Sequence, residues 1–458
     1  METDEKGAGR MVSHLSGDPG RAGKSMQDTG DEYVTNVRYL YSLQKFGIKL
    51  GLSKTITMLE RMGNPHLGRR YVHIGGTNGK GSVGAFMASV LHEAGLKVGL
   101  YTSPHLVRFT ERFRINGREM ERRQASALIQ ELRRVMDPQD PPTYFETTTV
   151  MALLHFARNG TDIDVMEVGM GGRLDATNVI TPLVSVITNI SAEHREYLGS
   201  GILQIAAEKA GIIKEGVEVV TGATQPAVVR LFEERCTRLG ASLRRLGADA
   251  RYRLTASGLH YYGRNRTLGR LAPGLSGDFQ ARNAALALAA LECLEEKGFR
   301  LTEQDLREGL RKARWPGRMH RVRERPTVLV DGAHNPAAAR TLARALQAGY
   351  RYRRLIMVVG IMADKDVGAI LRALIAPAHH VIYTRPAYPR AAEPETLREK
   401  AAGLGKGGEV VGDLAGALER AMGLAAPEDM VVVCGSLFTA GEALSLLDPE
   451  HFEPDIPA

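Results

Sequence analysis

The stretch that decides the fold of this chain is Gly75-Gly76-Thr77-Asn78-Gly79-Lys80-Gly81-Ser82. Residues 71–76 are rich in β-branched and aromatic side chains, and apolar residues recur at helical spacing over residues 82–94. We therefore predict a strand, a glycine turn and a helix, followed by a second strand over residues 97–101. Such a βαβ unit indicates an α/β fold with a parallel sheet.

The same stretch has the chemistry of a phosphate-binding loop. Glycines let backbone N–H groups approach phosphate oxygens closely, and the start of a helix favours negative charge. Lys80 supplies a positive charge for the β- and γ-phosphates, and Ser82 supplies a hydroxyl for a phosphate or a Mg²⁺ ion. The spacing departs from the standard GxxxxGK[ST] pattern, because Gly81 separates Lys80 from Ser82 and the loop is one residue shorter before Gly79. A plain turn with a solvent-facing lysine is the alternative, and the strand–loop–helix context favours the nucleotide site.

The length of 458 residues exceeds the roughly 250–300 residues of one hydrophobic core. The strand and helix alternation restarts after Trp315-Pro316-Gly317. We predict the α/β class, with a P-loop-type, mostly parallel sheet ATPase domain at residues 31–314 and a smaller Rossmann-like α/β domain at residues 318–458. Residues 1–30 have no apolar signal region, and we expect a disordered tail there.

Composition limits the partners of the protein. The net charge is +8, but arginines are spread along the chain without a basic stripe interleaved with aromatics. We expect small anionic substrates and no nucleic acid. No run reaches the roughly 18 apolar residues of a membrane span, so we expect no membrane partner. Three scattered cysteines indicate reduced, buried thiols and a cytoplasmic location.

Polar residues at predicted strand ends are candidates for a metal site. Glu167 lies in an apolar strand, where a carboxylate needs a partner; Mg²⁺ is one candidate and an arginine is the other. Ser103 follows the strand at residues 97–101, and ligands of parallel sheets lie at the carboxyl ends of strands. Arg318 and Asp331 lie near the domain boundary, from which they can close over a nucleotide.

Taken together, these segments resemble folylpolyglutamate synthase and the bifunctional dihydrofolate synthase of the Mur ligase superfamily. The resemblance runs from about residue 39 to 444. Its motifs lie at residues 46–52, 76–82, 102–106, 167–178, 208–212, 315–318, 331–336 and 434–436.

The resemblance implies roles for individual residues. ATP would be bound by Thr77, Asn78, Gly79, Lys80, Gly81 and Ser82, with Asn283, Arg318 and Asp331 on the opposite side. Ser103 and Glu167 would hold one Mg²⁺, and His194 would help to hold a second. Lys209 matches a carbamylated lysine of the family, and Lys80, Lys209 and His194 would be catalytic. The pterin side of the substrate would meet Thr143, Tyr144, Phe145, Glu146, Arg173, Leu174, Asp175 and Ala176.

One stretch departs from the family pattern. Glu193 stands where the family usually has Asp, and Arg195 replaces the usual Thr, while His194 is kept. The extra methylene of Glu193 is expected to shift the surroundings of the second metal.

The function that the resemblance implies is ATP-dependent addition of L-glutamate to a folate-type carboxylate through an acyl phosphate. It covers tetrahydrofolate polyglutamylation and the conversion of dihydropteroate to dihydrofolate, by a monomer. A Mur-type ligase acting on a peptidoglycan precursor is the nearest alternative. A non-catalytic nucleotide or nucleic-acid binder is a second, which leaves Glu167, His194 and Lys209 without a common explanation.

Overall fold

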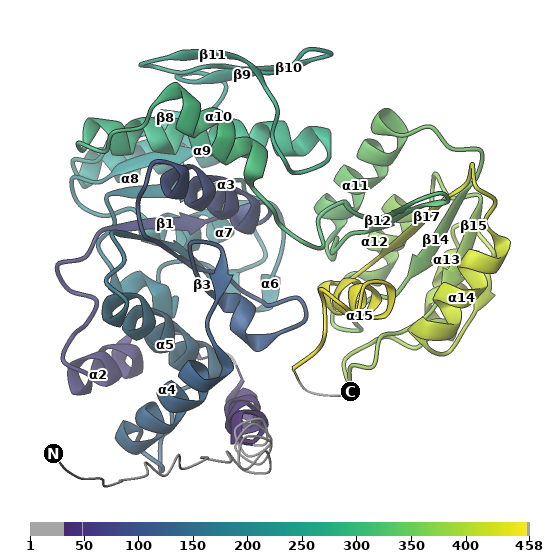
Figure 1. Ribbon diagram of the computed structural model, residues 1–458, viewed down its shortest axis with the longest axis horizontal. Coiled ribbons are helices and arrows are strands. Elements are labelled where there is room, and N and C mark those ends of the chain that lie inside the picture. Colours follow the sequence, from purple (N-terminus) through teal and green to yellow (C-terminus); the bar gives the residue numbers. More distant parts are fainter. Residues whose placement is uncertain (1–31, 48, 456–458) are drawn as a thin grey trace, which may run out of the picture.

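The computed structural model describes residues 32–47 and 49–455. The tail expected at residues 1–30 lies outside them. The described chain forms two α/β units side by side, each built on its own sheet (Figure 1). The first unit holds every strand up to residue 271, and the second holds every strand from residue 320 onwards.

The large sheet of the first unit has eight strands in the order β4-β3-β2-β5-β1-β6-β7-β8. All neighbours pair in parallel except β2 with β3 and β3 with β4. The mostly parallel sheet predicted from the sequence is confirmed. The strands are β1 (Tyr71–Gly75), β2 (Val98–Tyr101), β3 (Phe113–Ile115), β4 (Arg118–Glu119), β5 (Ile163–Glu167), β6 (Val184–Ile187), β7 (Glu218–Thr221) and β8 (Leu243–Arg245).

Helices cover both faces of this sheet, as the alternating side chains of β1 require. Val72 and Ile74 pack with α3 (Lys80–Glu93), α9 (Asp278–Glu296) and α10 (Glu303–Lys312). Tyr71 lies in a second cluster with α2 (Ser53–Arg61), α4 (Arg122–Val135) and α5 (Tyr144–Arg158). A third cluster joins β6 and β7 to α7 (Ile202–Lys209) and α8 (Pro226–Arg238).

A small antiparallel sheet packs against α9 at the top of Figure 1. It consists of β9 (Arg251–Thr255), β10 (Gly258–Tyr262) and β11 (Thr267–Leu271). Leu268 and Leu271 of the third strand join Leu259 in the core around α9.

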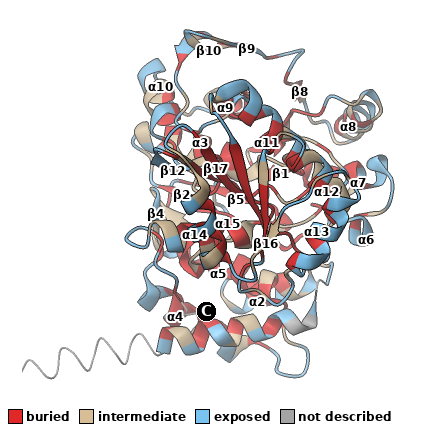
Figure 2. Cartoon of the chain, turned by 90° about the vertical axis from the view of Figure 1, so that its right-hand side faces the viewer, coloured by how far each residue is buried: buried red, intermediate tan, exposed pale blue. Residues whose placement is uncertain are grey.

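The second unit has a six-stranded sheet in the order β12-β13-β17-β14-β15-β16. Only β12 runs antiparallel to its neighbour. Its strands are β12 (His320–Glu324), β13 (Thr327–Val330), β14 (Leu355–Val359), β15 (His380–Tyr383), β16 (Glu409–Val410) and β17 (Met430–Cys434). One face carries α11 (Pro336–Gly349), α12 (Val367–Leu374) and α13 (Pro394–Ala402), and the other carries α14 (Leu414–Leu424) and α15 (Leu437–Leu447). Figure 2 shows the central strands as the buried layer between these helices.

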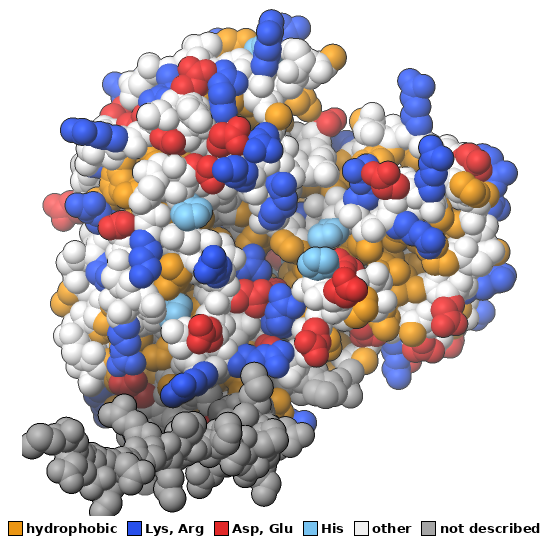
Figure 3. All heavy atoms as spheres, viewed as in Figure 1, with side chains coloured by type: hydrophobic (Ala, Val, Ile, Leu, Met, Phe, Trp, Pro, Cys, Tyr) orange, Lys and Arg blue, Asp and Glu red, His pale blue; other side chains and the backbone are white. Residues whose placement is uncertain are grey.

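The structure shows where the basic side chains and the cysteines lie and how long and apolar the helices are. Lysine and arginine side chains are scattered over the visible face among acidic ones and form no single stripe (Figure 3). Cys236, Cys293 and Cys434 are buried and free, as predicted. Within residues 32–47 and 49–455, every helix is too short or too polar to cross a membrane.

Candidate active site

The glycine-rich loop connects β1 to α3, and two of its glycines have left-handed backbones. Gly76 has a φ of 126° and Gly79 a φ of 87°, a region that side chains disfavour. A Cβ on Gly76 would collide with Thr188, and one on Gly79 would lie 2.7 Å from Asn283 Oδ1. The loop therefore folds tightly against the end of β6 and the start of α9.

Gly81, the extra glycine of the loop, lacks room for a side chain for a different reason. A Cβ there would lie 2.7–2.8 Å from the ring of Trp315, which joins the two units. The guanidinium carbon of Arg114 lies over the same ring, 5.4 Å from its centroid. Gly81 thus allows the connecting segment to pack directly on the first turn of α3.

Two N–H groups of the loop are already used inside the protein. Thr77 N–H donates to Asn189 O at 2.9 Å, and Asn78 N–H donates to Asn189 Oδ1 at 3.1 Å. The first-turn N–H groups of α3 have no partner within the helix and are available to an anion. Ser82 is buried, and its Oγ accepts a hydrogen bond from Gln280 Nε2 at 3.3 Å.

Two lysines converge on the loop. Lys80 Nζ donates to Gly76 O at 3.3 Å and to Thr77 O at 3.2 Å. Lys209 Nζ, at the end of α7, donates to the same Gly76 O at 2.8 Å. Lys209 is 3% exposed, and burial, helped by the charge of Lys80, lowers its pKa to about 7. Lys209 is therefore held inside the site, next to the loop.

Glu167 ends β5 beside the loop. One of its oxygens lies 3.9 Å from Lys80 Nζ, and the other accepts from Ser103 N–H at 3.2 Å. Burial raises the pKa of this carboxyl, while the positive charges of Lys80, Arg318 and Arg112 act to lower it. The structure brings Lys80, Ser103 and Glu167 together.

His194 lies on the loop between β6 and α6 (Arg195–Leu198), with a left-handed φ of 50°. Burial lowers the pKa of His194 to about 4, which leaves the imidazole neutral. Its Nε2 lies 3.8 Å from Glu193 Oε1. Among residues 32–47 and 49–455, no three His, Cys, Asp or Glu side chains gather as a metal-binding group.

The second unit reaches the site through the loop after β13. Asn335 Nδ2 donates to Asn78 Oδ1 at 2.9 Å and to Glu193 Oε1 at 3.3 Å. His334 Nε2 lies 3.2 Å from the same Glu193 oxygen. Sequence reasoning singled out Asp331 in this segment but not His334 or Asn335. The signal was their position at a strand end that precedes a helix.

Asp331 is buried and holds this loop in shape. Its two oxygens accept from Met319 N–H and Ala333 N–H, each at 2.8 Å. Burial raises the pKa of Asp331, and the neighbouring charge of Arg318 acts to lower it. The positive charge of Arg318 therefore acts on the carboxyl groups of both Asp331 and Glu167.

The residues expected on the pterin side form two neighbouring structures, because α5 packs against η3 (Ala176–Val179). Thr143 and Glu146 bond each other's backbone N–H groups as a capping box at the start of α5. Asp175 is buried and accepts from Met170 N–H at 2.8 Å and Thr177 N–H at 3.0 Å.

The remaining pterin-side residues differ in exposure. Arg173 is exposed and paired with Glu208 at 2.9 Å, and Leu174 is half-buried. Ala176 is buried, and the ring of Phe145 lies against Gly169.

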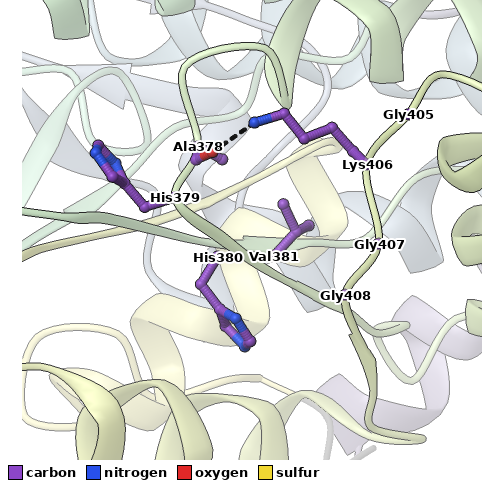
Figure 4. Close-up of a pocket in the computed structure, with 8 residues that line it drawn as sticks. All are labelled: Ala378, His379, His380, Val381, Gly405, Lys406, Gly407 and Gly408. Atoms are coloured by element: carbon purple, nitrogen blue, oxygen red, sulfur yellow. Dashed lines mark hydrogen bonds between the residues drawn. The ribbon is translucent and has the colours of Figure 1, made fainter.

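A hollow of about 360 Å³ lies elsewhere, at the β15–β16 edge of the second sheet. Figure 4 shows His379, His380 and Lys406 around it, with Lys406 Nζ donating to Ala378 O. His380 pairs with Glu409 at 3.1 Å. The site residues predicted from the sequence all lie elsewhere.

Comparison with known proteins identifies the class first. Residues 74–291 match the Mur ligase middle domain, and residues 317–437 match the Mur ligase, glutamate ligase domain. The fold and the loop thus define a ligase of the Mur type.

Individual relatives narrow the class. The chain is 35% identical to a dihydrofolate synthase/folylpolyglutamate synthase of Bacillus subtilis, over 78% of this chain and 86% of that one. It is 36% identical to a probable bifunctional folylpolyglutamate synthase/dihydropteroate synthase of Haloferax volcanii, covering 90% of this chain but about half (50%) of that protein. A Yersinia pestis folylpolyglutamate synthase/dihydrofolate synthase, solved with AMPPNP and a Mn ion, superposes with a TM-score of 0.81 at 33% identity, over 91% of this chain and 98% of that one. The chain belongs to the folylpolyglutamate synthase/dihydrofolate synthase family of ligases, and these matches favour it over a peptidoglycan ligase.

Proposed function

We propose that this chain uses ATP to add L-glutamate to the carboxylate of a folate-type acceptor. Tetrahydrofolate and dihydropteroate are the acceptors we expect. The observation that carries the proposal is the convergence of Lys80, Lys209 and Glu167 at the carboxyl edge of the large sheet. The cation of Lys80 at the start of α3 and the carboxylate of Glu167 at the end of β5 fit a triphosphate and its metal.

The donor set fits a divalent cation. Glu167 offers a buried carboxylate at a strand end, and Ser103 lies beside it. We propose that these two hold Mg²⁺, which would neutralise phosphate charge. A second ion would be held by neutral His194, with a carbamylated Lys209 as the further anionic group. The low pKa of Lys209 supports this, because only a neutral amine reacts with CO₂.

The chain's own residues would then position the reactants. The start of α3 and Lys80 hold the phosphates, with Thr77, Asn78, Gly79, Gly81 and Ser82 in the loop and Asn283 behind it. Arg318, whose charge reaches both Asp331 and Glu167, would neutralise the nucleotide from the second unit. Thr143, Tyr144, Phe145, Glu146, Arg173, Leu174, Asp175 and Ala176 remain our proposal for the pterin side.

The reaction has two displacements. An acceptor carboxylate oxygen attacks the γ-phosphorus of ATP, and ADP leaves. The amino group of L-glutamate attacks the resulting acyl phosphate, inorganic phosphate leaves, and a proton is released. Packing of the second unit over the site would exclude water, which would otherwise hydrolyse the acyl phosphate.

An oxygen-transfer experiment tests this proposal. Dihydropteroate labelled with ¹⁸O in its carboxylate should pass one label to inorganic phosphate for each amide formed. Lys80→Ala should lose this transfer, whereas Lys97→Ala, an exposed lysine that bonds Asn159 O away from the loop, should retain it. Amide formation with unlabelled phosphate would overturn the acyl phosphate mechanism.

Three further points belong to the proposal. We propose that the two α/β units are domains with a boundary at residues 315–317, because the family models end and begin on either side of it. We also propose a cytoplasmic location, supported by the free cysteines, and a monomeric state.

A further inference from the structure

Arg112 is a buried cation without a carboxylate partner. It ends η2 (Phe109–Arg112) and is 5% exposed. Its Nε donates to His105 Nδ1 at 2.9 Å. Across the described ranges 32–47 and 49–455, no Asp or Glu forms an ion pair with Arg112. A buried charge is costly unless it is paired, so this guanidinium is a strong site for an incoming anion.

A comparison within the molecule makes the exception clear. Arg244 is equally buried at 5% exposure, and it pairs with Glu218 at 3.1 Å and also with Glu296. Arg69, also largely enclosed, pairs with Asp164 at 3.0 Å. Arg244 and Arg69 therefore each carry an acidic partner, and Arg112 does not.

A second polar group without a partner lies next to Arg112. The guanidinium carbon is 5.1 Å from the ring centroid of Tyr144, whose hydroxyl is buried and forms no hydrogen bond among the described residues. Buried tyrosine hydroxyls normally find a partner. The Tyr144 ring also lies 5.7 Å from that of Tyr41, tilted by 33°. The Arg112 guanidinium, which has no ion pair, and the Tyr144 hydroxyl, which has no hydrogen bond, therefore lie next to each other beside the rings of Tyr144 and Tyr41.

This surrounding adjoins the proposed metal residues. Arg112 bonds His105, two residues after Ser103, whose N–H donates to Glu167. The charge of Arg112 is also one of those that lower the pKa of Glu167. An anion bound to Arg112 would thus lie beside the place where we propose that phosphoryl transfer occurs.

We propose that Arg112 binds the carboxylate of the acceptor, with the acceptor's aromatic ring against Tyr144 and Tyr41 and a hydrogen bond to the Tyr144 hydroxyl. The inference rests on the proposed function and adds to it the residue that recognises the reacting end of the substrate. A planar guanidinium matches a carboxylate through two parallel hydrogen bonds, which an ammonium cannot reproduce.

Binding of dihydropteroate, which has a single carboxylate, tests the inference. Calorimetry should show about 10- to 100-fold weaker binding to Arg112→Ala, the range expected for a hydrogen bond to a charged group, with Arg112→Lys in between. Tyr144→Phe should bind dihydropteroate about 3- to 10-fold more weakly than the wild type. The neutral carboxamide of dihydropteroate should bind the wild type and Arg112→Ala equally, which a general loss of structure would not produce.

Two controls keep the result interpretable. Arg123→Ala, an exposed arginine of α4, should bind dihydropteroate like the wild type. Thermal unfolding of each variant shows whether it is folded, and Arg112→Lys serves if Arg112→Ala is not. Unchanged affinity for the carboxylate in folded Arg112→Ala overturns the inference alone. Failure of the wild type to bind any folate-type acceptor overturns the proposed function instead.

Discussion

At the scale of single residues, the burial of Lys209 sets the protonation state on which its proposed role depends. Its amine is buried against Gly76 O, and burial together with the charge of Lys80 lowers its pKa to about 7. The neutral fraction therefore grows as the pH rises through about 7, and only neutral amine forms a carbamate. ADP release should increase between pH 6 and pH 8 and should respond to added bicarbonate. Lys209→Arg, which stays charged, should lose most activity; a fully active Lys209→Arg enzyme would contradict the role.

Gly81 allows a prediction on packing. An alanine Cβ would lie 2.7–2.8 Å from the Trp315 ring, so Gly81→Ala should displace the ring at a cost of about 1–3 kcal/mol. Thermal unfolding should show a lower Tm together with weaker ATP binding. Gly368→Ala in α12 is the matched control, because nothing lies within 4 Å of its added Cβ. That control should be neutral or slightly stabilising.

These residues show the limit of sequence reasoning at this scale. The extra glycine after Lys80 was noticeable in the sequence, but its contact with distant Trp315 was not. Equally, Arg112 lies outside the motifs seen in the sequence and His334 lies inside one, but the sequence does not show what either side chain contacts. Their roles come from a missing ion pair and an interdomain contact, which exist only in the folded chain.

At the scale of elements, the last described residues tie the two units together. Asp455 accepts from Tyr33 Oη at 2.7 Å, from Phe109 N–H at 2.9 Å and from Arg122 Nε at 3.1 Å. Asp455→Ala leaves the buried donors of Tyr33 and Phe109 unpaired and should cost about 1–3 kcal/mol in urea unfolding. Glu453→Ala, an exposed carboxylate in the same segment, should change little. Equal stability of both variants would show that the segment does not fasten the fold.

The turn before β17 has a pH-dependent element. Asp429 is buried between Arg353 (3.1 Å) and Arg354 (2.6 Å), whose hydrogen bonds hold its pKa well below the usual range. A depressed folded-state pKa gives stability that is complete above the unfolded value of about 3.9 and is lost as the pH falls below it. Asp429→Asn should therefore be destabilising at pH 7, and its difference from the wild type in urea unfolding should shrink below about pH 4. A constant difference across that range would contradict the ion pair.

Elements with strong periodicity were predicted well, and short charged ones were not. The apolar strands β1 (Tyr71–Gly75) and β2 (Val98–Tyr101) lie close to the predicted residues 71–76 and 97–101. By contrast β12, which reads His-Arg-Val-Arg-Glu, is ordered by pairing with β13 rather than by its own pattern. Tertiary pairing overrides local preference at such edges.

At the scale of the whole molecule, the nucleotide loop and the second unit meet through Asn335. Asn335→Ser keeps a hydroxyl able to cap α11 but is too short to reach both Asn78 and Glu193. We expect a similar Tm and a kcat reduced by up to about 10-fold, since two interdomain hydrogen bonds are lost. Asn335→Ala should also have a lower Tm, because it removes the cap of α11 as well. Comparing the two variants therefore distinguishes the effect of the cap from that of the hydrogen bonds to Asn78 and Glu193. An unchanged kcat in Asn335→Ser would show that the contact has no part in turnover.

Fold and family were largely predictable at this scale, because several uncommon motifs occur in a fixed order. The way in which these motifs come together in the folded chain was not predictable. Glu193 reads as a simple replacement of Asp in the sequence, yet its oxygen accepts from the second unit. The chain spans about half the length of its Haloferax relative, so its activity has to be measured directly.

The most direct measurement is ADP release in the presence of L-glutamate with each of three acceptors. The account predicts release with tetrahydrofolate and dihydropteroate, dependence on both glutamate and acceptor, and none with a UDP-muramyl peptide. Release with the muramyl peptide alone, or release independent of any folate acceptor, would contradict it.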